Sequence, residues 1–277
     1  MHDSYKVIDA NHKRILPDFK ELFRYKDLFL TLTWRDFRVR YAQTTIGLLW
    51  ALLQPIITLL ILTLVFGRFV GVETGNIPHV LFTIAGMSTW TYFSYVMTNA
   101  GNSIIANQGM VKKIYFPRLI IPLSKAVVGF IDFGISLLIM IVLMIWYGIA
   151  PSSNVWLAPV FILVGVLAAL SVGIWLSALS VRFRDFQHVV PFMVQIGLYL
   201  TPIAYPAEFA TQQLPKWAST LYYLNPMAGV VQGFRWALFG GEAPGNLMFV
   251  SFGMVLIILF TGLLYFRKVE DEMADYV

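Results

Sequence analysis

The sequence has no cysteine and little charge. Its 277 residues contain 0 Cys, and only 13% of them are Asp, Glu, Lys or Arg. The absence of cysteine excludes disulfides, thiolate metal sites and cysteine nucleophiles. A soluble protein carries roughly 25% charged and about 45–50% apolar residues, whereas 58% of this chain is hydrophobic. Because one core cannot bury so many apolar side chains, the composition predicts an all-α integral membrane protein.

Motifs for nucleotide, metal and catalytic chemistry are also missing. The pattern G-x-x-x-x-G-K-[ST], which binds nucleotide phosphates, does not occur, so the chain does not itself hold ATP by that device. The four histidines are scattered over different loops and suggest no metal site. No Ser–His–Asp set can be assembled on one side of a membrane. We therefore expect no enzymatic activity, no metal, no cofactor and no nucleic-acid partner for this chain.

Six apolar segments predict membrane-spanning helices, each of which needs about 20 residues. The longest apolar run, 119–181, contains only Lys125 and Asp132 as charged residues. A turn-rich stretch around Gly148 and Pro151 divides this run into two helices. The predicted spans are 44–67, 78–100, 119–147, 156–181, 186–201 and 246–266. They form one membrane domain, 44–277, after a cytoplasmic tail, 1–43.

Lys and Arg lie almost entirely on one side of these spans. Nine precede the first span, four lie in or beside the second connection, two lie in the fourth connection, and two follow the last span. That side holds 17 of the 20 basic residues, and the other side holds Arg68, Lys216 and Arg235. The positive-inside rule then places both termini in the cytoplasm.

The tail has the pattern of an amphipathic helix at the membrane interface. Between Asp18 and Tyr41, large apolar residues recur at helical spacings with charges between them. Asp18 together with Glu21 resembles a capping box. The segment predicts a helix lying flat at the cytoplasmic interface; the alternative is an anchor that only fixes orientation.

The segment between the last two spans, about 202–245, is apolar but rich in proline. Asn225 and Pro226 predict a helix start, and Gly240 with Gly241 predicts its stop, so this helix is too short to cross a membrane. Short, broken apolar helices indicate a re-entrant hairpin on the outer side, buried in protein. Helices lying flat at the interface are the alternative.

The second cytoplasmic connection, Asn102–Arg118, is longer and more apolar than a simple loop needs to be. A short helix with exposed apolar and basic residues is suited to docking in a partner's groove. Attraction of its basic residues to anionic lipid is the alternative.

Two features lie within the spans. Asp132 follows Lys125 by two helical turns on the same face. A carboxylate inside a span is functional by default, and pairing that packs the spans together is the alternative. Small residues recur at every fourth position in the fourth span, which favours close helix packing within a protomer or across a dimer. They are Gly165, Ala169, Gly173 and Ser177.

Aromatic residues are abundant, with 22 Phe, 13 Tyr and 8 Trp. Most belong to lipid-facing belts and to core packing. Aromatic faces also stack on the apolar faces of sugars, so a minority are candidates to line a polysaccharide conduit. These candidates are Tyr92, Tyr95, Phe192 and Tyr199.

Several motifs taken together resemble the permease of ABC-2 type exporters, in the branch that exports lipid-linked O-antigen, capsule or teichoic acid. The resemblance covers nearly the whole chain. In chain order, the motifs that carry it are Trp34–Tyr41, Gly47–Pro55, Val65–Gly67, Lys112–Arg118 with Pro122 and Leu123, Arg182–Asp185, Asn225-Pro226 and Phe266–Glu270.

The resemblance implies a homodimer in the bacterial inner membrane that binds two copies of a separate ABC ATPase, which holds ATP and Mg. The cargo would be a glycan on undecaprenyl pyrophosphate, and the outer hairpin would gate the exit. The tail helix and the second cytoplasmic connection, Asn102–Arg118, would contact the ATPase, and we therefore call this connection the coupling loop. The coupling residues would be Lys112, Lys113, Tyr115, Phe116, Pro117 and Arg118.

Four residues of the tail helix lie just before the first span, near the inner headgroups: Trp34, Arg35, Arg38 and Arg40. Arginine pairs well with phosphate oxygens, so this group is a candidate to attract the pyrophosphate. Plain anchoring or ATPase contact is the alternative.

Three other functions are compatible with parts of the sequence. An ABC-2 exporter of drugs or small lipids is the nearest. A membrane enzyme acting on lipid-linked sugars would need paired carboxylates or a metal motif. A secondary carrier would need several intramembrane charges and internal repeats, and one such charge and no clear repeat are found.

Overall fold

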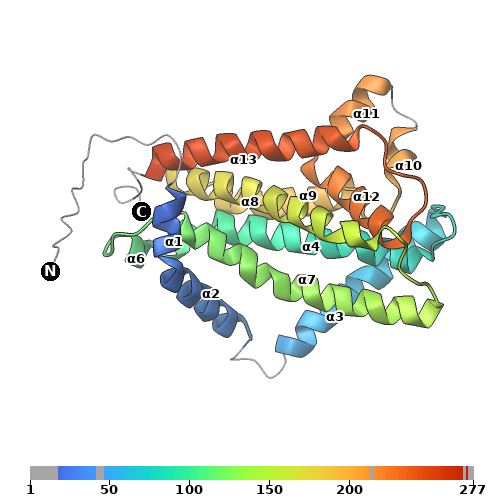
Figure 1. The fold of residues 1–277 in the computed structure, drawn as a ribbon, viewed down its shortest axis with the longest axis horizontal. Helices are drawn as coiled ribbons and strands as arrows, with labels where there is room; N and C mark the ends of the chain where they lie inside the picture. Colours follow the sequence, from blue (N-terminus) through green and yellow to red (C-terminus); the bar gives the residue numbers. More distant parts are fainter. Residues whose placement is uncertain (1–17, 42–46, 213–214, 271–272, 274–277) are drawn as a thin grey trace.

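The computed structural model describes residues 18–41, 47–212, 215–270 and 273. Within these ranges, all regular structure is helical, and the long helices run side by side along the molecule (Figure 1). This confirms the all-α class. Lys6, Lys13 and Arg14 of the basic tail, and the predicted start of the first span, lie outside the described residues.

Each of the six predicted spans corresponds to a long helix, and the boundaries agree within a few residues. The helices are α3 (Gly47–Leu62), which continues as a π-helical stretch (Thr63–Phe69), α4 (His79–Gly101), α7 (Ile120–Tyr147), α8 (Ala158–Arg182), α9 (Phe186–Leu200) and α13 (Met248–Glu270). A short 3₁₀ turn, Val155–Leu157, precedes α8.

Four helical segments within the described residues are long and apolar enough to cross a membrane: Leu49–Phe69, Ile120–Tyr147, Val155–Arg182 and Met248–Glu270. The helix α9 is apolar but has only 15 residues. The helix α4 has 23 residues and is more polar. The count of six crossings therefore stays a prediction.

The polarity of α4 follows from its central position. It packs against α7, α8, α9 and α12, and most of its side chains are buried. Buried hydroxyls such as those of Ser88 and Thr89 are satisfied within the helix: Ser88 donates to the carbonyl of Ala85 at 2.9 Å, and Thr89 donates to that of Gly86 at 2.8 Å. A helix surrounded by protein needs less apolar surface than one that faces lipid, so a hydropathy criterion underrates it.

The stripe of small residues on α8 brings helices together within one protomer. A Cβ atom on Gly173 would lie 2.9 Å from the Cβ of Ala100 on α4, and one on Gly165 would lie 3.2 Å from Val230. Ala169 is fully buried. Of the two meanings left open by the sequence, packing within the protomer accounts for these residues.

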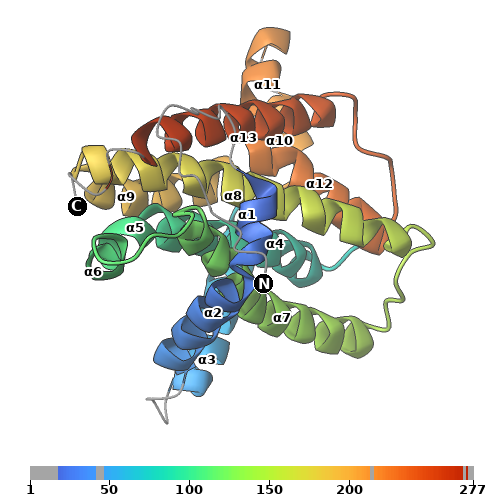
Figure 2. The same cartoon turned by 60° about the vertical axis from the view of Figure 1, so that its left-hand side comes forward.

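The amphipathic tail segment forms two helices instead of one, α1 (Phe19–Arg24) and α2 (Lys26–Tyr41), with a break at Tyr25. The Asp18 carboxylate accepts hydrogen bonds from the backbone N–H groups of Lys20 and Glu21 at 3.0 and 3.4 Å, which confirms it as the helix cap. Figure 2 shows α1 and α2 at the near end of the bundle, and α2 packs against α7.

The segment between the last two long helices holds α10 (Ala207–Thr211), α11 (Lys216–Tyr222) and α12 (Pro226–Phe239), at the end of the molecule far from α1 (Figure 1). As predicted, Asn225 caps α12 by accepting from the N–H of Met227 at 3.0 Å, and Gly240 ends it at φ +73°. The helix α12 packs against α4, α8 and α13. Its depth in a membrane stays a prediction.

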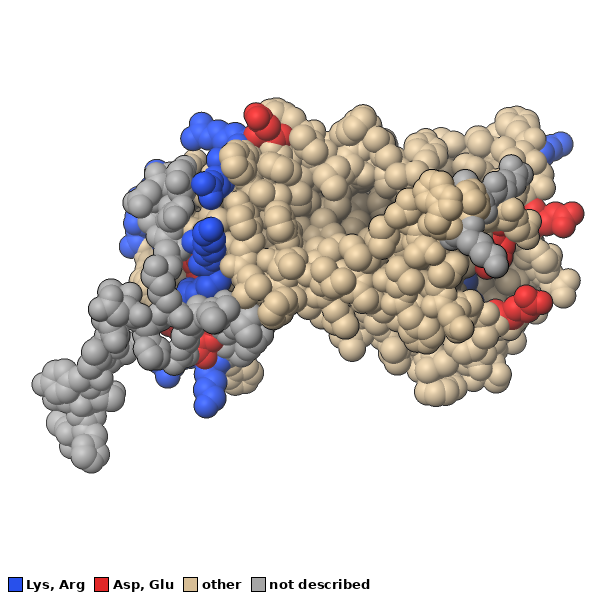
Figure 3. Space-filling model, turned by 90° about the horizontal axis from the view of Figure 1, so that it is seen from above, with Lys and Arg blue, Asp and Glu red and all other residues tan. Residues whose placement is uncertain are grey.

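Charge is divided between the two ends. Figure 3 shows Lys and Arg side chains gathered at the end that carries α1 and α2, then a wide band of uncharged surface, and a few charges at the far end. Glu208 of α10 and Glu242 in the connection after α12 belong to segments at the far end. We call the first end the basic end. The side of the membrane on which each end lies stays a prediction.

Candidate functional site

The coupling loop is anchored to the basic end by a separate hydrophobic cluster. The loop contains two short helices, α5 (Ser103–Ala106) and α6 (Gln108–Val111). Phe116 is only 4% exposed and belongs to this cluster. Its buried neighbours come from α2, α5, α7, α8 and the end of α13: Leu32, Ile104, Ile120, Ile174 and Phe266 are among them. Phe116 therefore anchors the loop and is not part of an open docking surface.

The end of α13 holds the exit of the coupling loop. One carboxylate oxygen of Glu270 accepts from the backbone N–H of Arg118 at 3.0 Å, and the other pairs with Arg267 at 2.6 Å. Phe266 and Phe116 lie in the same cluster. Two of the motifs quoted for the family resemblance, far apart in sequence, therefore meet in space.

Ahead of this anchor, the coupling loop presents an exposed face. Ile114 is 60% exposed and Tyr115 is 70% exposed, beside the exposed Lys112 and Lys113. Large apolar side chains flanked by lysines on a protein end suit the groove of a partner. Pro117 and Arg118 are half-buried behind this face.

The helix α2, which we call the interface helix, is held against α7 by two ion pairs that we call the ladder. On α2, Asp36 and Arg40 lie one turn apart; on α7, Lys125 and Asp132 lie two turns apart. Asp36 pairs with Lys125, and Arg40 pairs with Asp132 at 2.6 Å. The Tyr41 hydroxyl also donates to Asp132 at 2.8 Å. Asp132 is therefore paired within the protein, but its partners lie on α2 and not on another span, so the pairing joins the tail helix to α7.

The environment of the ladder keeps its donors protonated. Burial and the neighbouring carboxylate of Asp132 raise the pKa of the Tyr41 hydroxyl. Burial lowers the pKa of Arg40, but Asp132 and the neighbouring tyrosines together raise it overall. The Arg40 guanidinium also lies 4.3 Å from the ring centroid of Tyr95, a cation–π contact that adds to the pairing.

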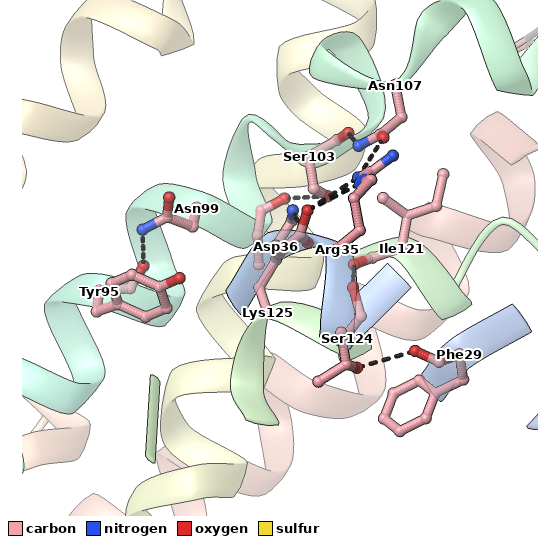
Figure 4. Close-up of polar contacts among 12 residues, drawn as sticks. Phe29, Arg35, Asp36, Tyr95, Asn99, Ser103, Asn107, Ile121, Ser124 and Lys125 are labelled. Carbon is pink, nitrogen blue, oxygen red and sulfur yellow. Dashed lines mark hydrogen bonds and ion pairs between the residues drawn. The ribbon is translucent and has the colours of Figure 1, made fainter. Parts of the chain in front are cut away.

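Arg35 joins the interface helix to the coupling loop (Figure 4). Its guanidinium binds Asp36 at 2.9 Å and the side-chain oxygen of Asn107 at 2.8 Å. The Asn107 amide donates in turn to the carbonyl of Ser103 at 2.7 Å. Because Asp36 also holds Lys125, these contacts join α2, the coupling loop and α7 into one connected unit.

The candidate pyrophosphate residues therefore have different surroundings. Arg35 and Arg40 are engaged in the contacts above. Arg38 is exposed, and its guanidinium has no ion pair within the described ranges. Trp34 is 60% exposed and stacks on Phe37 at a centroid distance of 5.3 Å. Of the three arginines, Arg38 is therefore the one whose guanidinium is available to bind an anion.

The four candidate conduit aromatics are not brought together. Tyr92 is 4% exposed and donates to the carbonyl of Ala126 at 3.1 Å, and Tyr95 lies under Arg40; both pack inside the protomer. Phe192 and Tyr199 are 61% and 62% exposed on α9. Only the second pair is placed to face a conduit outside the protomer.

Asp36, Asn107 and Glu270 were not among the residues expected from the sequence. The spacing of Asp36 could have indicated its place in the ladder, because it lies four residues before Arg40 and therefore on the same face of the helix. The sequence does not indicate that Asn107 binds Arg35 or that Glu270 binds the backbone of Arg118, because these partners are distant in the chain. Across the described ranges, no three His, Asp or Glu side chains come together as metal ligands would.

Comparison with known proteins identifies the family of the chain. Residues 27–239 match the family model for the ABC-2 type transporter, a range that contains all of α2 except Lys26, the coupling loop and α12. The chain is 29% identical to an O-antigen export system permease protein RfbA of Klebsiella pneumoniae, with 90% of this chain and 94% of the relative aligned.

Two other relatives align over similar lengths. An RfbA protein of Myxococcus xanthus is 27% identical over 93% of this chain and 98% of its own. The polysialic acid transport protein KpsM of Escherichia coli is 25% identical over 86% of this chain and 92% of its own. The family match covers most of the chain, and the chain therefore belongs to the ABC-2 type transporter family.

Proposed function

We propose that this chain is the permease subunit of an ATP-driven exporter of a lipid-linked polysaccharide, an O-antigen-like glycan carried on undecaprenyl pyrophosphate. Alignment along almost the full length with O-antigen export permeases supports the substrate class. The protein lies in the bacterial inner membrane, surrounded by lipid, with both termini in the cytoplasm.

The observation that carries the proposal is the connected unit at the basic end. Energy from a partner that hydrolyses ATP must enter through contacts that differ between two states. The exposed face of the coupling loop, Lys112–Tyr115, offers such a contact. Two copies of a separate ABC ATPase, with ATP and Mg, dock on this face and on the interface helix.

Movement of the coupling loop reaches the membrane through the ladder. Arg35 and Asn107 link the loop to α2, and the pairs Asp36–Lys125 and Arg40–Asp132 link α2 to α7. A push on the loop therefore displaces the interface helix and α7 together. This path gives ATP hydrolysis a mechanical connection to the spans.

The homodimer uses the two long helices that are least buried within one protomer. In Leu49–Phe69 the buried residues are Leu59 and Leu62, and in α9 the only buried residue is Val190. Large apolar side chains such as Trp50, Leu60 and Phe192 are exposed on these two helices. A second copy covers these faces, and their separation opens a conduit into which Phe192 and Tyr199 project.

Arg38 attracts the cargo at the entrance. Its free guanidinium suits the paired oxygens of a pyrophosphate. Trp34, four residues earlier, is exposed on the same helix and offers a flat apolar surface beside it.

Deletion of the gene tests the cargo. In a strain with no redundant exporter, we expect undecaprenyl-linked glycan to accumulate inside the cell and surface glycan to disappear, and a plasmid copy restores export. A copy with Tyr115→Ala and Ile114→Ala in the docking face should restore export poorly. Normal surface glycan after the deletion would show that the cargo assignment is wrong.

A further inference from the structure

Arg235 is a buried arginine in α12, at the end far from the coupling loop. It is 6% exposed. Its Nε donates to the carbonyl of Phe82 at 3.0 Å, and its Nη2 donates to the carbonyl of Ile203. The guanidinium carbon lies 3.6 Å from the ring centroid of Phe82. One side chain therefore joins α12 to α4 and to the non-helical segment between α9 and α10.

This charge has no acidic partner within ion-pair distance among the described residues. The nearby acid of the hairpin, Glu208, instead accepts from the amide of Gln232 at 3.1 Å. Burying an arginine without a carboxylate is costly, so carbonyl dipoles and an aromatic face must replace it. When such a contact opens, only the arginine loses its partners, whereas the opening of a buried ion pair leaves two charged groups without partners.

The site is built around a glycine on α4. A Cβ atom on Gly86 would lie 2.2 Å from Nη2 of Arg235 and 2.9 Å from the carbonyl oxygen of Ile203. Any larger residue at this position would displace the guanidinium or the segment that it holds. Gly86 thus gives a second and independent way to disturb the contact.

The segment held by Arg235 connects to the most weakly attached long helix. Thr201, Ile203 and Ala204 are buried, while α9 itself buries only Val190 against the rest of the protomer. Asn225 donates to Thr201 at 2.9 Å. The outer end of α9 is attached in two ways: it packs directly on α4, where a Cβ atom on Gly197 would lie 2.4 Å from the ring of Trp90, and it continues into the segment that Arg235 and Asn225 hold.

From this geometry we infer that Arg235 is a positioning residue for transport: it keeps the outer end of the conduit closed at rest by clamping the 201–205 segment between α12 and α4. The inference rests on the proposed exporter function, since it assigns a gate to a conduit. During opening, the carbonyl of Ile203 leaves the guanidinium and the outer end of α9 moves away from α4.

The absence of native cysteine allows a direct test. Ala204, which is 3% exposed, is replaced by Cys in the full-length permease with its ATPase in whole cells, and a membrane-impermeant maleimide is added outside. In the absence of further substitutions, the cysteine of this Ala204→Cys protein, which we call the parent, should react slowly with the maleimide at rest. Arg235→Met and Gly86→Ala should each raise the resting labelling rate about tenfold, the change expected when a charged hydrogen bond is lost from a two-state equilibrium.

Arg235→Lys should fall between the parent and Arg235→Met, because a lysine keeps the charge but not the two-pronged geometry. Gly134→Ala is the matched control, since a Cβ there meets no atom within 4 Å, and its labelling rate should equal that of the parent. If Arg235→Met fails to accumulate, Arg235→Lys and Gly86→Ala decide the question.

An unchanged resting rate in Arg235→Lys and Gly86→Ala, even with a lower melting temperature, would show that Arg235 is only structural and would overturn the inference. Fast labelling of the parent at rest would overturn it as well. The assay uses no glycan, so an error in the proposed cargo leaves its result unaffected. The two proposals therefore fail separately.

Discussion

Asp132 puts a carboxylate inside α7, and Arg40 and Tyr41 of the interface helix both bind it. Its side chain is 9% exposed, whereas that of Arg40 is 35% exposed. Removing one partner of a fully buried pair costs about 3–5 kcal/mol. Because Arg40 is partly solvated, a smaller value applies here, about 1–2 kcal/mol.

We expect Asp132→Asn to lower the free energy of unfolding by this amount, since Asn keeps the shape and loses the charge. Combined with Arg40→Met, the loss should be smaller than the sum of the two single losses. The measurement is denaturant unfolding in detergent. Asp185→Asn, an exposed carboxylate, is the control. Additive losses would mean that the pair does not hold α2 to α7.

Arg38 and Arg35 should respond differently to the same change. Arg38→Gln removes an exposed, available guanidinium, so we expect the apparent KM for lipid-linked cargo to rise severalfold with little change in stability. Arg35→Gln breaks the contacts to Asp36 and Asn107, so it should weaken coupling at saturating cargo. Cargo-stimulated ATPase activity measures both. An unchanged KM in Arg38→Gln would remove Arg38 from the entrance.

At the scale of elements, the coupling loop has an exposed side and a buried side. Tyr115→Ala and Ile114→Ala should lower ATPase affinity about tenfold each, the effect of losing a contact at the centre of an interface, and leave stability nearly unchanged. Phe116→Ala empties a buried position, so it should cost about 3–5 kcal/mol of stability. Pull-down with the purified ATPase and thermal unfolding separate the two effects.

Tyr147→Ala, an exposed aromatic at the far end of α7, is the control for the exposed pair and should leave ATPase binding unchanged. Full ATPase affinity in the Tyr115→Ala, Ile114→Ala double variant would contradict the assignment of this loop as the docking face.

The positions of the long helices could be predicted from the sequence, because apolar runs and turn residues are local signals. The cap at Asp18 and the start of α12 at Asn225 are local in the same way, and both predictions are confirmed. The tail was predicted as one helix because its apolar spacing continues through Tyr25; the backbone nevertheless breaks there.

Partners distant in sequence could not be predicted. Asp132 shows a charge in a span, but its pairing with Arg40 depends on how α2 lies against α7. In the same way, the family resemblance implied that Phe116 contacts the ATPase, and only the fold shows that it is buried in a cluster with side chains from α2, α7, α8 and α13. Arg235 was noted only as a charge on the outer side, because its carbonyl partners leave no pattern in the sequence.

At the scale of the whole molecule, the two ends have different chemistry and different tasks. The basic end carries the docking face and the charge ladder (Figure 3). The far end carries the hairpin, where Arg235 joins three elements. Between them, α3 and α9 expose apolar faces, on which we propose that a second copy packs. A motor bound at one end and an exit at the other fit transport in one direction.

The most direct measurement is transport in vesicles. The permease and its ATPase are reconstituted with undecaprenyl-pyrophosphate-linked glycan, and a glycan-cleaving enzyme is added on the side opposite the ATPase. The account predicts that glycan becomes cleavable only when ATP is hydrolysed, and that the Tyr115→Ala, Ile114→Ala variant abolishes most of this signal. Glycan that stays uncleaved during steady ATP hydrolysis, while a drug or an unlinked lipid crosses, would contradict it.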